Sequence, residues 1–361
     1  MSETKTGRAS RIPAPPPLCI PAGHIPASQA ERPLLAGIDV GGTNIKIGLV
    51  DDLGRTLAYS TLPTEQEKGA EDAARRMADG LRHLVQEAGL AIQEVARAGL
   101  ATPGPMDIPA GMLLTPGNLP HWWNFPIRDR VSQHCGLPVT YANDANAAAY
   151  GEYWCGAGQG NHSMVLFTLG TGIGGGIIVN GMLVDGVHSA GSECGHIVID
   201  PRPDARRDSL DKPGTLEAYC GAYGVVARTI EAIQAGRKST LAAQQANGNS
   251  ITPLVIAQAA EAGDGLAREI VLETADYLAL GCVSLIHVID PDSVVLGGAM
   301  TFGGAQTPLG REFLARIRQS VPSRLLPPLR DQVKISFATL GGDAGYIGAA
   351  GLARCEYHAH C

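Results

Sequence analysis

The chain has 361 residues, 45% of them hydrophobic and 17% charged, and a formal net charge of −7. Its length favours two domains, and its acidic balance argues against a nucleic-acid partner, which usually requires a basic surface. Eight scattered cysteines without a C-x-x-C pair, and apolar runs too short to span a membrane, predict a cytoplasmic protein with free thiols and no membrane contact.

Residues 1–33 are set apart by prolines at positions 13, 15–17, 21, 26 and 33. These prolines exclude a helix, and the segment has little apolar periodicity to bury. The apolar stretch is also too interrupted for a secretion signal. We therefore expect a disordered Pro-rich tail over 1–33, for which the sequence indicates no role.

A glycine-rich turn lies between two apolar β-type runs, Leu34–Ile38 and Ile45–Val50. Glycine suits a turn in which backbone N–H groups approach a ligand closely or φ is positive, and consecutive N–H groups form an anion-binding nest. Beyond this turn the pattern predicts a strand at Thr56–Leu62, an amphipathic helix at Ala70–Gly89 and a buried strand at Val95–Ala101 that ends in the turn Thr102–Pro105.

The strand–turn–strand pattern then returns, with the turn Leu169–Gly176 between the runs Met164–Thr168 and Ile177–Val179. Before it, a short strand at Val139–Ala142 leads to Asn143, which is placed to cap an Ala-rich helix at Asp144–Tyr153.

The remaining pattern follows a long irregular segment, Glu193–Lys212. It predicts helices at Leu216–Ala235, Pro253–Ala262 and Leu266–Ile289, strands at Ser293–Leu296 and Val333–Ala338, and a closing helix at Gly345–Ala353. The order β-β-β-α-β…β-α occurs twice, which predicts two similar α/β domains with a cleft between them. We expect a small domain over 34–142 and a large domain over 143–342, with the helix in 343–355 packing back on the small domain.

Two common nucleotide-binding motifs also contain glycine-rich turns, and the sequence fits neither of them. A dinucleotide fingerprint would open a helix, but Gly170–Gly175 leads directly into a β-type run. The G-x-x-x-x-G-K-[ST] string of a Walker A loop is absent. Ordinary hairpin turns remain the alternative for either turn alone, and the acid Asp39 at the end of the first strand makes that alternative weaker.

Taken together, these pieces resemble the ROK family of sugar kinases, within the actin-like ATPase (ribonuclease H-like) superfamily that includes hexokinase. Asp39–Lys46 is similar to the first phosphate motif, Gly170–Gly176 to the second, and Val294–Gly298 to the adenosine motif. Further matching pieces, in order, are Pro116–Pro120 with Trp122, Asn143–Asp144, Glu193–His196, Leu216–Glu217 and Leu340–Ala350. The resemblance runs from about residue 34 to 354 and implies two mixed sheets flanked by helices, with the active site in the cleft.

Phosphoryl transfer to a hydroxyl requires positioning, neutralisation of phosphate charge and a group that accepts the hydroxyl proton. Asp144, at a helix start, is the candidate general base. The resemblance implies sugar binding by Asn143, Glu193, His196, Glu217, Asn118 and Gly104. It implies binding of ATP by Asp39, Gly41, Gly42, Thr43, Lys46, Gly170, Thr171, Gly172, Gly174, Gly175, Gly297 and Gly298. Asp39 is expected to hold a water of the Mg²⁺ shell, because Mg²⁺ prefers oxygen ligands.

One departure from the family pattern concerns zinc. Family members typically follow the histidine with a C-x-C-G-x-x-G-C run that completes a tetrahedral zinc site, but residues 198–214 hold no cysteine and Thr215 stands where the last one would be. Cys194 and Cys220 have the wrong spacing to substitute. We predict no structural zinc, and expect Arg206 or Arg207 to order this loop by pairing with Asp200, Asp208 or Asp211.

The sequence thus predicts an ATP-dependent hexokinase that phosphorylates the 6-hydroxyl of a hexose, with glucose as the first candidate. A fructokinase or an N-acetylmannosamine or N-acetylglucosamine kinase of the same family is the alternative, since these enzymes share the site. A sugar-binding protein without catalysis, or a repressor, is disfavoured because Asp144 and the turns are retained and no helix-turn-helix segment precedes Leu34. The resemblance implies a homodimer or homotetramer, and the preferred phosphoryl donor is not readable from the sequence.

Overall fold

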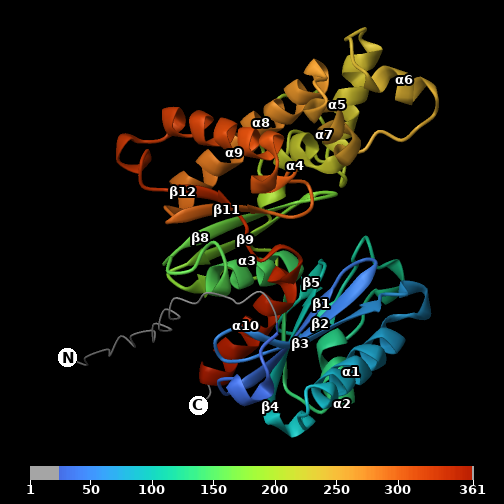
Figure 1. Ribbon diagram of the computed structural model, residues 1–361, viewed down its shortest axis with the longest axis vertical. Helices are drawn as coiled ribbons and strands as arrows, with labels where there is room; N and C mark the ends of the chain where they lie inside the picture. Colours follow the sequence, from blue (N-terminus) through green and yellow to red (C-terminus); the bar gives the residue numbers. More distant parts are fainter. Residues whose placement is uncertain (1–23, 360–361) are drawn as a thin grey trace.

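The computed structural model describes residues 24–359, which form two α/β domains with two helices between them (Figure 1). The strands are β1 (Leu34–Val40), β2 (Asn44–Val50), β3 (Thr56–Pro63), β4 (Val95–Thr102), β5 (Met106–Asp107), β6 (Met112–Leu113), β7 (Val139–Asn143), β8 (Met164–Leu169), β9 (Ile173–Val179), β10 (Met182–Leu183), β11 (Ser293–Gly297) and β12 (Lys334–Phe337). The helices are α1 (Ala70–Glu87), α2 (Ile127–Cys135), α3 (Asp144–Cys155), α4 (Leu216–Cys220), α5 (Ala222–Gln234), α6 (Leu241–Ala246), α7 (Pro253–Glu261), α8 (Gly265–Ile289), α9 (Pro308–Ser320) and α10 (Ala344–Ala359).

Each domain is built on a five-stranded mixed sheet. The small-domain order is β3-β2-β1-β4-β7 and the large-domain order is β10-β9-β8-β11-β12. In both sheets the first three strands form an antiparallel meander and the last two run parallel to the strand that opens the domain. The predicted α/β architecture with two mixed sheets flanked by helices is confirmed.

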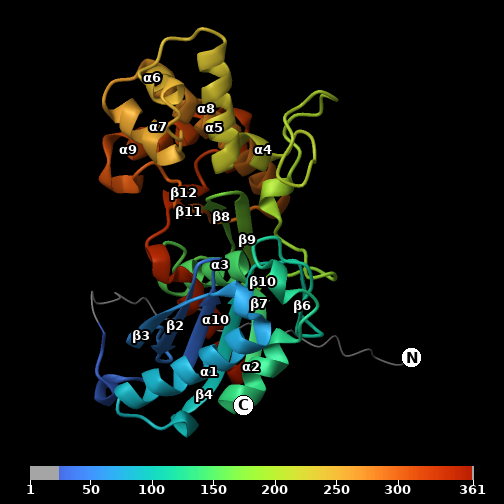
Figure 2. The same ribbon diagram turned by 90° about the vertical axis from the view of Figure 1, so that its right-hand side faces the viewer.

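The helices enclose each sheet. In the small domain, α1 and α2 pack on one face and α10 on the other; in the large domain, α3 covers one face while α8 and α9 lie on the opposite side (Figures 1 and 2). Helices α3 and α10 also pack on each other, so this pair joins the two sheets. The predicted domain boundary between Ala142 and Asn143 falls at the end of β7, and the C-terminal helix α10 packs on β1 and β4 of the small-domain sheet.

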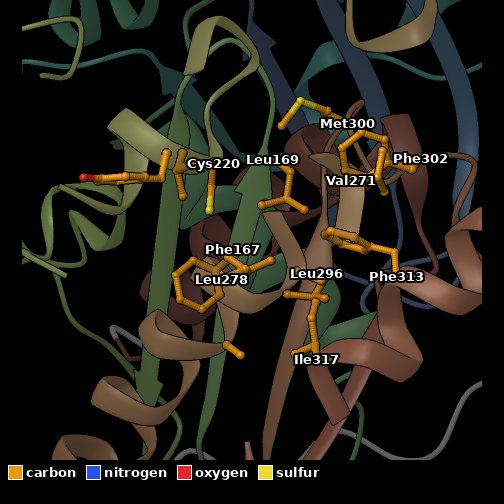
Figure 3. Packing of buried hydrophobic residues seen from close by; sticks show 14 of the residues in the cluster. Phe167, Leu169, Cys220, Val271, Leu278, Leu296, Met300, Phe302, Phe313 and Ile317 are labelled. Carbon is orange, nitrogen blue, oxygen red and sulfur yellow. The ribbon is translucent and has the colours of Figure 1, made fainter. Parts of the chain in front are cut away.

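Two separate apolar cores result. The large-domain core brings Phe167 and Leu296 from the sheet against Leu278 of α8 and Phe313 of α9 (Figure 3). The small-domain core places the strands against Met77 and the other apolar residues of α1, which are spaced to form one face. A third cluster, around Trp154 of α3, lies between the sheets.

Helix α8 is, among the described residues, the one helix long and apolar enough by composition to cross a membrane. More than half of its most apolar window (56%) is buried inside the domain, which is the behaviour of a core helix. Its packing against α4, α5, α7 and α9 accounts for its composition without a membrane.

Several elements differ from the sequence prediction. The expected helix over Leu216–Ala235 is two helices, because Gly221 is extended and the N–H of Ala222 donates to the carbonyls of Gly170 and Thr171 instead. Helices α2, α6 and α9 were not predicted. Helices α2 and α6 are short, but α9 has an apolar face at helical spacing (Leu309, Phe313 and Ile317), so its pattern was present in the sequence and was missed.

The prediction of a disordered tail is wrong for residues 24–33. Residues 24–33 have a defined structure, in which Ile25 is buried and its N–H donates to the carbonyl of Thr56 at 2.9 Å. Arg32 forms an ion pair with Glu94 at 2.7 Å. Residues 1–23, the rest of the predicted tail, lie outside the described residues.

Candidate active site

A cavity of about 1450 Å³ opens between the two domains, at the carboxyl ends of parallel strands from both sheets. Asp39 comes from β1, Asn143 from β7, Leu169 from β8 and Gly297 from β11. Strand ends of this kind are where open α/β sheets bind ligands. Most of the predicted site residues line this single cavity: Asp39, Lys46, Gly104, Asn118, Asn143, Asp144, Gly170, Thr171, Gly172, Gly174, Gly175, Glu193, His196, Glu217, Gly297 and Gly298.

Asp144 is the first residue of α3 and is half-buried in the cavity wall. Its Oδ1 accepts the N–H of Ala145 at 2.8 Å, which orients the carboxylate. Burial raises the pKa of Asp144, the Ala145 N–H opposes that shift, and the negative charge of Glu193 adds to it. A carboxylate with a raised pKa is a better proton acceptor, and this is the property that a general base needs.

Asp39 and Lys46 are direct partners across the hairpin of β1 and β2. Burial and the nearby charge of Asp144 raise the pKa of Asp39 to about 6, with Lys46 acting in the opposite direction. The ammonium group of Lys46 donates to the carbonyl of Gly342 at the start of the C-terminal segment. The small-domain hairpin therefore brings one acid and one cation to the cavity.

Asn143 caps α3: its Oδ1 accepts the N–H groups of Ala145 at 2.9 Å and Asn146 at 3.2 Å. Capping occupies this oxygen, so of the Asn143 side chain the Nδ2 donor remains for the sugar that we expect it to bind. A Cβ built on Gly104 would lie 3.7 Å from that Nδ2, an ordinary contact distance, so Gly104 is a neighbour of the Asn143 amide in the cavity. Asn118 is exposed at the cavity edge beside Gly42.

Glu193 and His196 flank a short turn after β10, where Glu193 is exposed and His196 half-buried. Glu217, by contrast, is buried in α4 and accepts three hydrogen bonds, from Ile173 N at 2.9 Å, Ser209 Oγ at 2.7 Å and Tyr223 OH at 3.0 Å. A carboxylate has about four acceptor positions, so Glu217 has little capacity left for a sugar hydroxyl. Its contacts fix the turn before β9 and the loop that carries Ser209.

The two glycine turns differ from the expected nests. Gly41, Gly42 and Thr43 do not line the cavity, and the N–H of Gly41 is used within the turn, donating to the carbonyl of Asn44. In the second turn, Gly174 and Gly175 are already in strand β9, so only Gly170–Gly172 is a turn.

None of the predicted glycines at 41, 42, 170, 172, 174 and 175 has a positive φ. In the second turn, close packing explains the glycine at position 172, because a Cβ there would lie 2.2 Å from Glu217 Oε2. Gly298 is different: its φ is +90° and a Cβ there would lie 2.3 Å from the carbonyl oxygen of Leu169. Glycine is required at Gly298 on both grounds.

The loop that lacks the zinc cysteines is ordered by hydrogen bonds around Asp208, whose side chain is fully buried. Arg207 pairs with Asp211 at 3.3 Å, which is one of the expected pairings, whereas Arg206 pairs with Glu231 of α5 and not with an aspartate. Within residues 24–359, no group of three or more His, Cys, Asp or Glu side chains has the arrangement of a metal site. The absence of a structural zinc ion stays a prediction, which metal analysis of the protein would test.

Sequence reasoning did not find part of the cavity wall. Residues Thr301 and Gly303–Gln306, after β11, and His188–Ser192, after β10, line it, as do Ser209 and Leu210. Gly303 and Gly304 have positive φ, so their pairing signals a turn, but nothing in the sequence connects that turn with the cavity.

Comparison with known proteins agrees with this geometry. The ROK family description matches residues 35–356. A glucokinase of Halalkalibacterium halodurans is 33% identical over 318 residues, covering 88% of this chain and 94% of that protein. An N-acetylmannosamine kinase of Citrobacter koseri is 32% identical over 317 residues, covering 88% and 97%.

Two solved structures show the same fold over nearly the whole chain. A ROK hexokinase from Thermus thermophilus has a TM-score of 0.76 at 31% identity, covering 90% of this chain and 99% of that one. A ROK family glucokinase from Streptomyces griseus, crystallised with glucose and AMPPNP, has a TM-score of 0.69 at 33% identity, covering 89% and 99%. The resemblance predicted from the motifs is confirmed.

Proposed function

Since the chain belongs to the ROK family, we propose that it is an ATP-dependent hexokinase that phosphorylates the 6-hydroxyl of a hexose, with glucose as the preferred sugar. The observation that carries this proposal is the single cavity that brings the acid Asp144 together with Asp39 and Lys46 of the first hairpin and with the second glycine turn, Gly170–Gly172. Glucokinases among the relatives, one of them crystallised with glucose and AMPPNP, support glucose and ATP as substrates.

In this proposal the small domain and the helix start at Asn143 hold the sugar. The Nδ2 of Asn143 donates to one hydroxyl, and Glu193 at the cavity mouth accepts from another. Asp144 accepts the proton of the 6-hydroxyl as its oxygen attacks the terminal phosphorus of the donor in line. Residues Gly170–Gly172 and the backbone beyond Gly297 also line the cavity, where they would face the nucleotide.

The cavity also suits a divalent cation with the donor. The negative charge of Asp144 raises the cost of ionising Asp39, and that of Glu193 raises the cost of ionising Asp144. An oxygen-seeking cation such as Mg²⁺ would relieve this repulsion, and Asp39 is the residue that we expect to hold its hydration shell. When bound, Mg²⁺ neutralises phosphate charge. Lys46 adds a fixed positive charge on the same side.

The second candidate is an N-acetylmannosamine kinase, which the Citrobacter koseri relative favours at nearly the same identity. The two candidates differ in whether the site accepts an N-acetyl group at the 2-position. A cytoplasmic location and a homodimer or homotetramer remain part of the proposal.

Initial rates with glucose, fructose, mannose, N-acetylmannosamine and N-acetylglucosamine at matched concentration, with ATP and Mg²⁺, test the proposal. The Asp144→Asn variant keeps the shape of the side chain but removes the base, so we expect kcat to fall by about 10²- to 10⁴-fold with little change in sugar affinity. Asp79→Asn is the matched control, because Asp79 is an exposed residue of α1 whose ion pair is with Arg82 of the same helix. Failure of the wild type to turn over any sugar, or full activity in Asp144→Asn, would end the proposal.

A further inference from the structure

The loop after His196 folds around one carboxylate. Asp208 Oδ1 accepts the N–H groups of Leu210 at 2.9 Å and Lys212 at 2.8 Å. Its Oδ2 accepts the hydroxyl of Thr215 at 3.0 Å and faces Nδ1 of His196 at 3.1 Å. The side chain of Asp208 is fully buried although the loop around it is largely exposed. A buried carboxylate with four partners is a fixed structural centre, not a surface charge.

The direction of these hydrogen bonds determines the state of the histidine ring. Burial opposes ionisation of Asp208, but the N–H groups of Lys212 and Leu210, with Thr215 and His196, outweigh it and lower its pKa. An ionised carboxylate can only accept hydrogen bonds. The Nδ1 atom of His196 must therefore carry a hydrogen, and in the neutral ring the other nitrogen, Nε2, then has a lone pair.

We propose that Asp208 is a positioning residue that holds His196 in the tautomer with hydrogen on Nδ1, so that Nε2 meets the ligand in the cavity as a hydrogen-bond acceptor. His196 lines the cavity and its side chain is 32% exposed, so the ring is anchored at one nitrogen and accessible at its edge. The inference rests on the proposed function in one respect: the ligand is taken to be a sugar, whose hydroxyl groups are donors that suit an acceptor nitrogen.

The residue next to Asp208 has a parallel contact. Ser209 Oγ donates to Glu217 Oε1 at 2.7 Å, and Tyr223 donates to the same oxygen. Two consecutive loop residues, Asp208 and Ser209, therefore fix two side chains of the cavity wall, His196 and Glu217. The hydrogen bonds of this loop thus orient the His196 and Glu217 side chains and determine which of their atoms donate or accept.

The Asp208→Asn variant tests the proposal. An Asn side chain has the same shape, and its oxygen can still accept from Leu210 and Lys212, but its amide group then points at His196 as a donor. Nδ1 must now accept, so the hydrogen moves to Nε2 and the ligand meets a donor instead of an acceptor. We expect KM for the sugar to rise by about tenfold or more, because two donors would oppose each other, while kcat changes by less than about threefold.

Nitrogen-15 NMR of histidine-labelled protein at pH 8 reads the tautomer directly, since free imidazole is mostly neutral at that pH. The chain has ten histidines, and the signal missing from a His196→Gln sample identifies residue 196. The wild type should show hydrogen on Nδ1 and Asp208→Asn should show it on Nε2. Asp211→Asn is the matched control: Asp211 is in the same loop, its side chain is 83% exposed, and it should change neither spectrum nor KM.

Hydrogen on Nε2 in the wild type, or the same tautomer in Asp208→Asn as in the wild type, would overturn the proposal. If Asp208→Asn fails to fold, the wild-type spectrum alone still decides. The spectra involve no substrate, so they remain decisive even if no sugar is phosphorylated. In that event the proposed function fails and the assignment of Asp208 is judged separately.

Discussion

The two sheets have the same strand order but present different chemistry at the tips of their leading hairpins. In the small domain Asp39 pairs with Lys46 across β1 and β2, whereas at the corresponding place in the large domain Thr168 pairs with Gly174 across β8 and β9. One hairpin therefore brings two charges to the cavity, and the other brings a hydroxyl group and bare backbone. The residues at these four positions therefore give the two copies of one fold different chemistry.

The helices that cover the inner faces of the sheets are also exchanged along the chain. Helix α3 follows the small-domain sheet in sequence but packs on β9 of the large domain, and α10 follows the large-domain sheet but packs on β1 and β4 of the small domain. Glycine allows this close approach, because a Cβ on Gly37 or Gly99 would lie 1.8 Å from a carbonyl oxygen of α10. The α3–α10 pair is therefore the physical link between two otherwise separate cores.

Among the variants that test this link, we expect the largest loss of stability from substitution of Glu152. It is buried near the end of α3 and accepts the N–H groups of Ala157, Thr339 and Leu340, which ties α3 to the segment between β12 and α10. Glu152→Ala removes the shared acceptor of these three N–H groups; Thr339 is exposed, but Ala157 and Leu340 are half-buried, and each half-buried group left unsatisfied costs up to about 1–3 kcal/mol. We expect the free energy of unfolding in urea to fall by about 3 kcal/mol or more.

Glu152→Gln should lose less, because its amide oxygen still accepts some of these hydrogen bonds. Glu87→Ala is the control, since Glu87 ends α1 with its side chain 61% exposed and its ion pair is with His83 of the same helix. Equal stability of Glu152→Ala and the control would mean that the link between the domains does not depend on this carboxylate.

The second prediction concerns the charged hairpin: the free energy of unfolding should depend on pH through the carboxyl group of Asp39. Its pKa is raised from 3.8 to about 6 in the folded protein, so between these values the folded state retains a proton that the unfolded state has lost. The contribution of this group to stability is therefore fully present below pH 4 and is lost as the pH rises through 6. Asp39→Asn removes that dependence, and its stability relative to the wild type should be about 2–3 kcal/mol better at pH 7 than at pH 4.

Urea unfolding of both proteins at the two pH values measures this difference. Thr168 in the other hairpin has no ionisable group, which is why the effect is expected on one side of the cavity only. A pH-independent difference between Asp39→Asn and the wild type would contradict the raised pKa.

The strand–turn–strand elements that occur in both domains could be predicted from the sequence alone. Alternating apolar runs, the caps and the turns predicted both hairpins, the helix that begins at Asp144 and the order of the two domains, because these depend on local pattern. The motif residues also meet in one cavity, apart from Gly41–Thr43, since their positions at strand ends follow from the fold.

What the sequence could not predict depends on contacts between distant residues. Nothing local indicates that Gly221 will be extended, because the cause is the N–H of Ala222 donating to a turn some fifty residues earlier in the chain. Glu217 carries a motif position, but its three donors come from separate segments and turn it from a free ligand into a buried support. Asp208 belongs to no motif, and only the folded loop shows that its buried carboxylate accepts hydrogen bonds from several parts of that loop.

The smallest expected loss of stability comes from a substitution at the close contact between helices α3 and α10. A Cβ on Gly348 of α10 would lie 1.6 Å from the carbonyl oxygen of Ala147 in α3, so Gly348→Ala must push the two helices apart. We expect a loss of about 1–3 kcal/mol, as for other overpacked sites. Gly265→Ala is the matched control, because Gly265 begins α8 with nothing near its added Cβ and should be neutral or slightly stabilising. Urea unfolding of both variants decides the point: equal stability would show that the helices can separate without loss, and the link between the domains would then have to lie elsewhere.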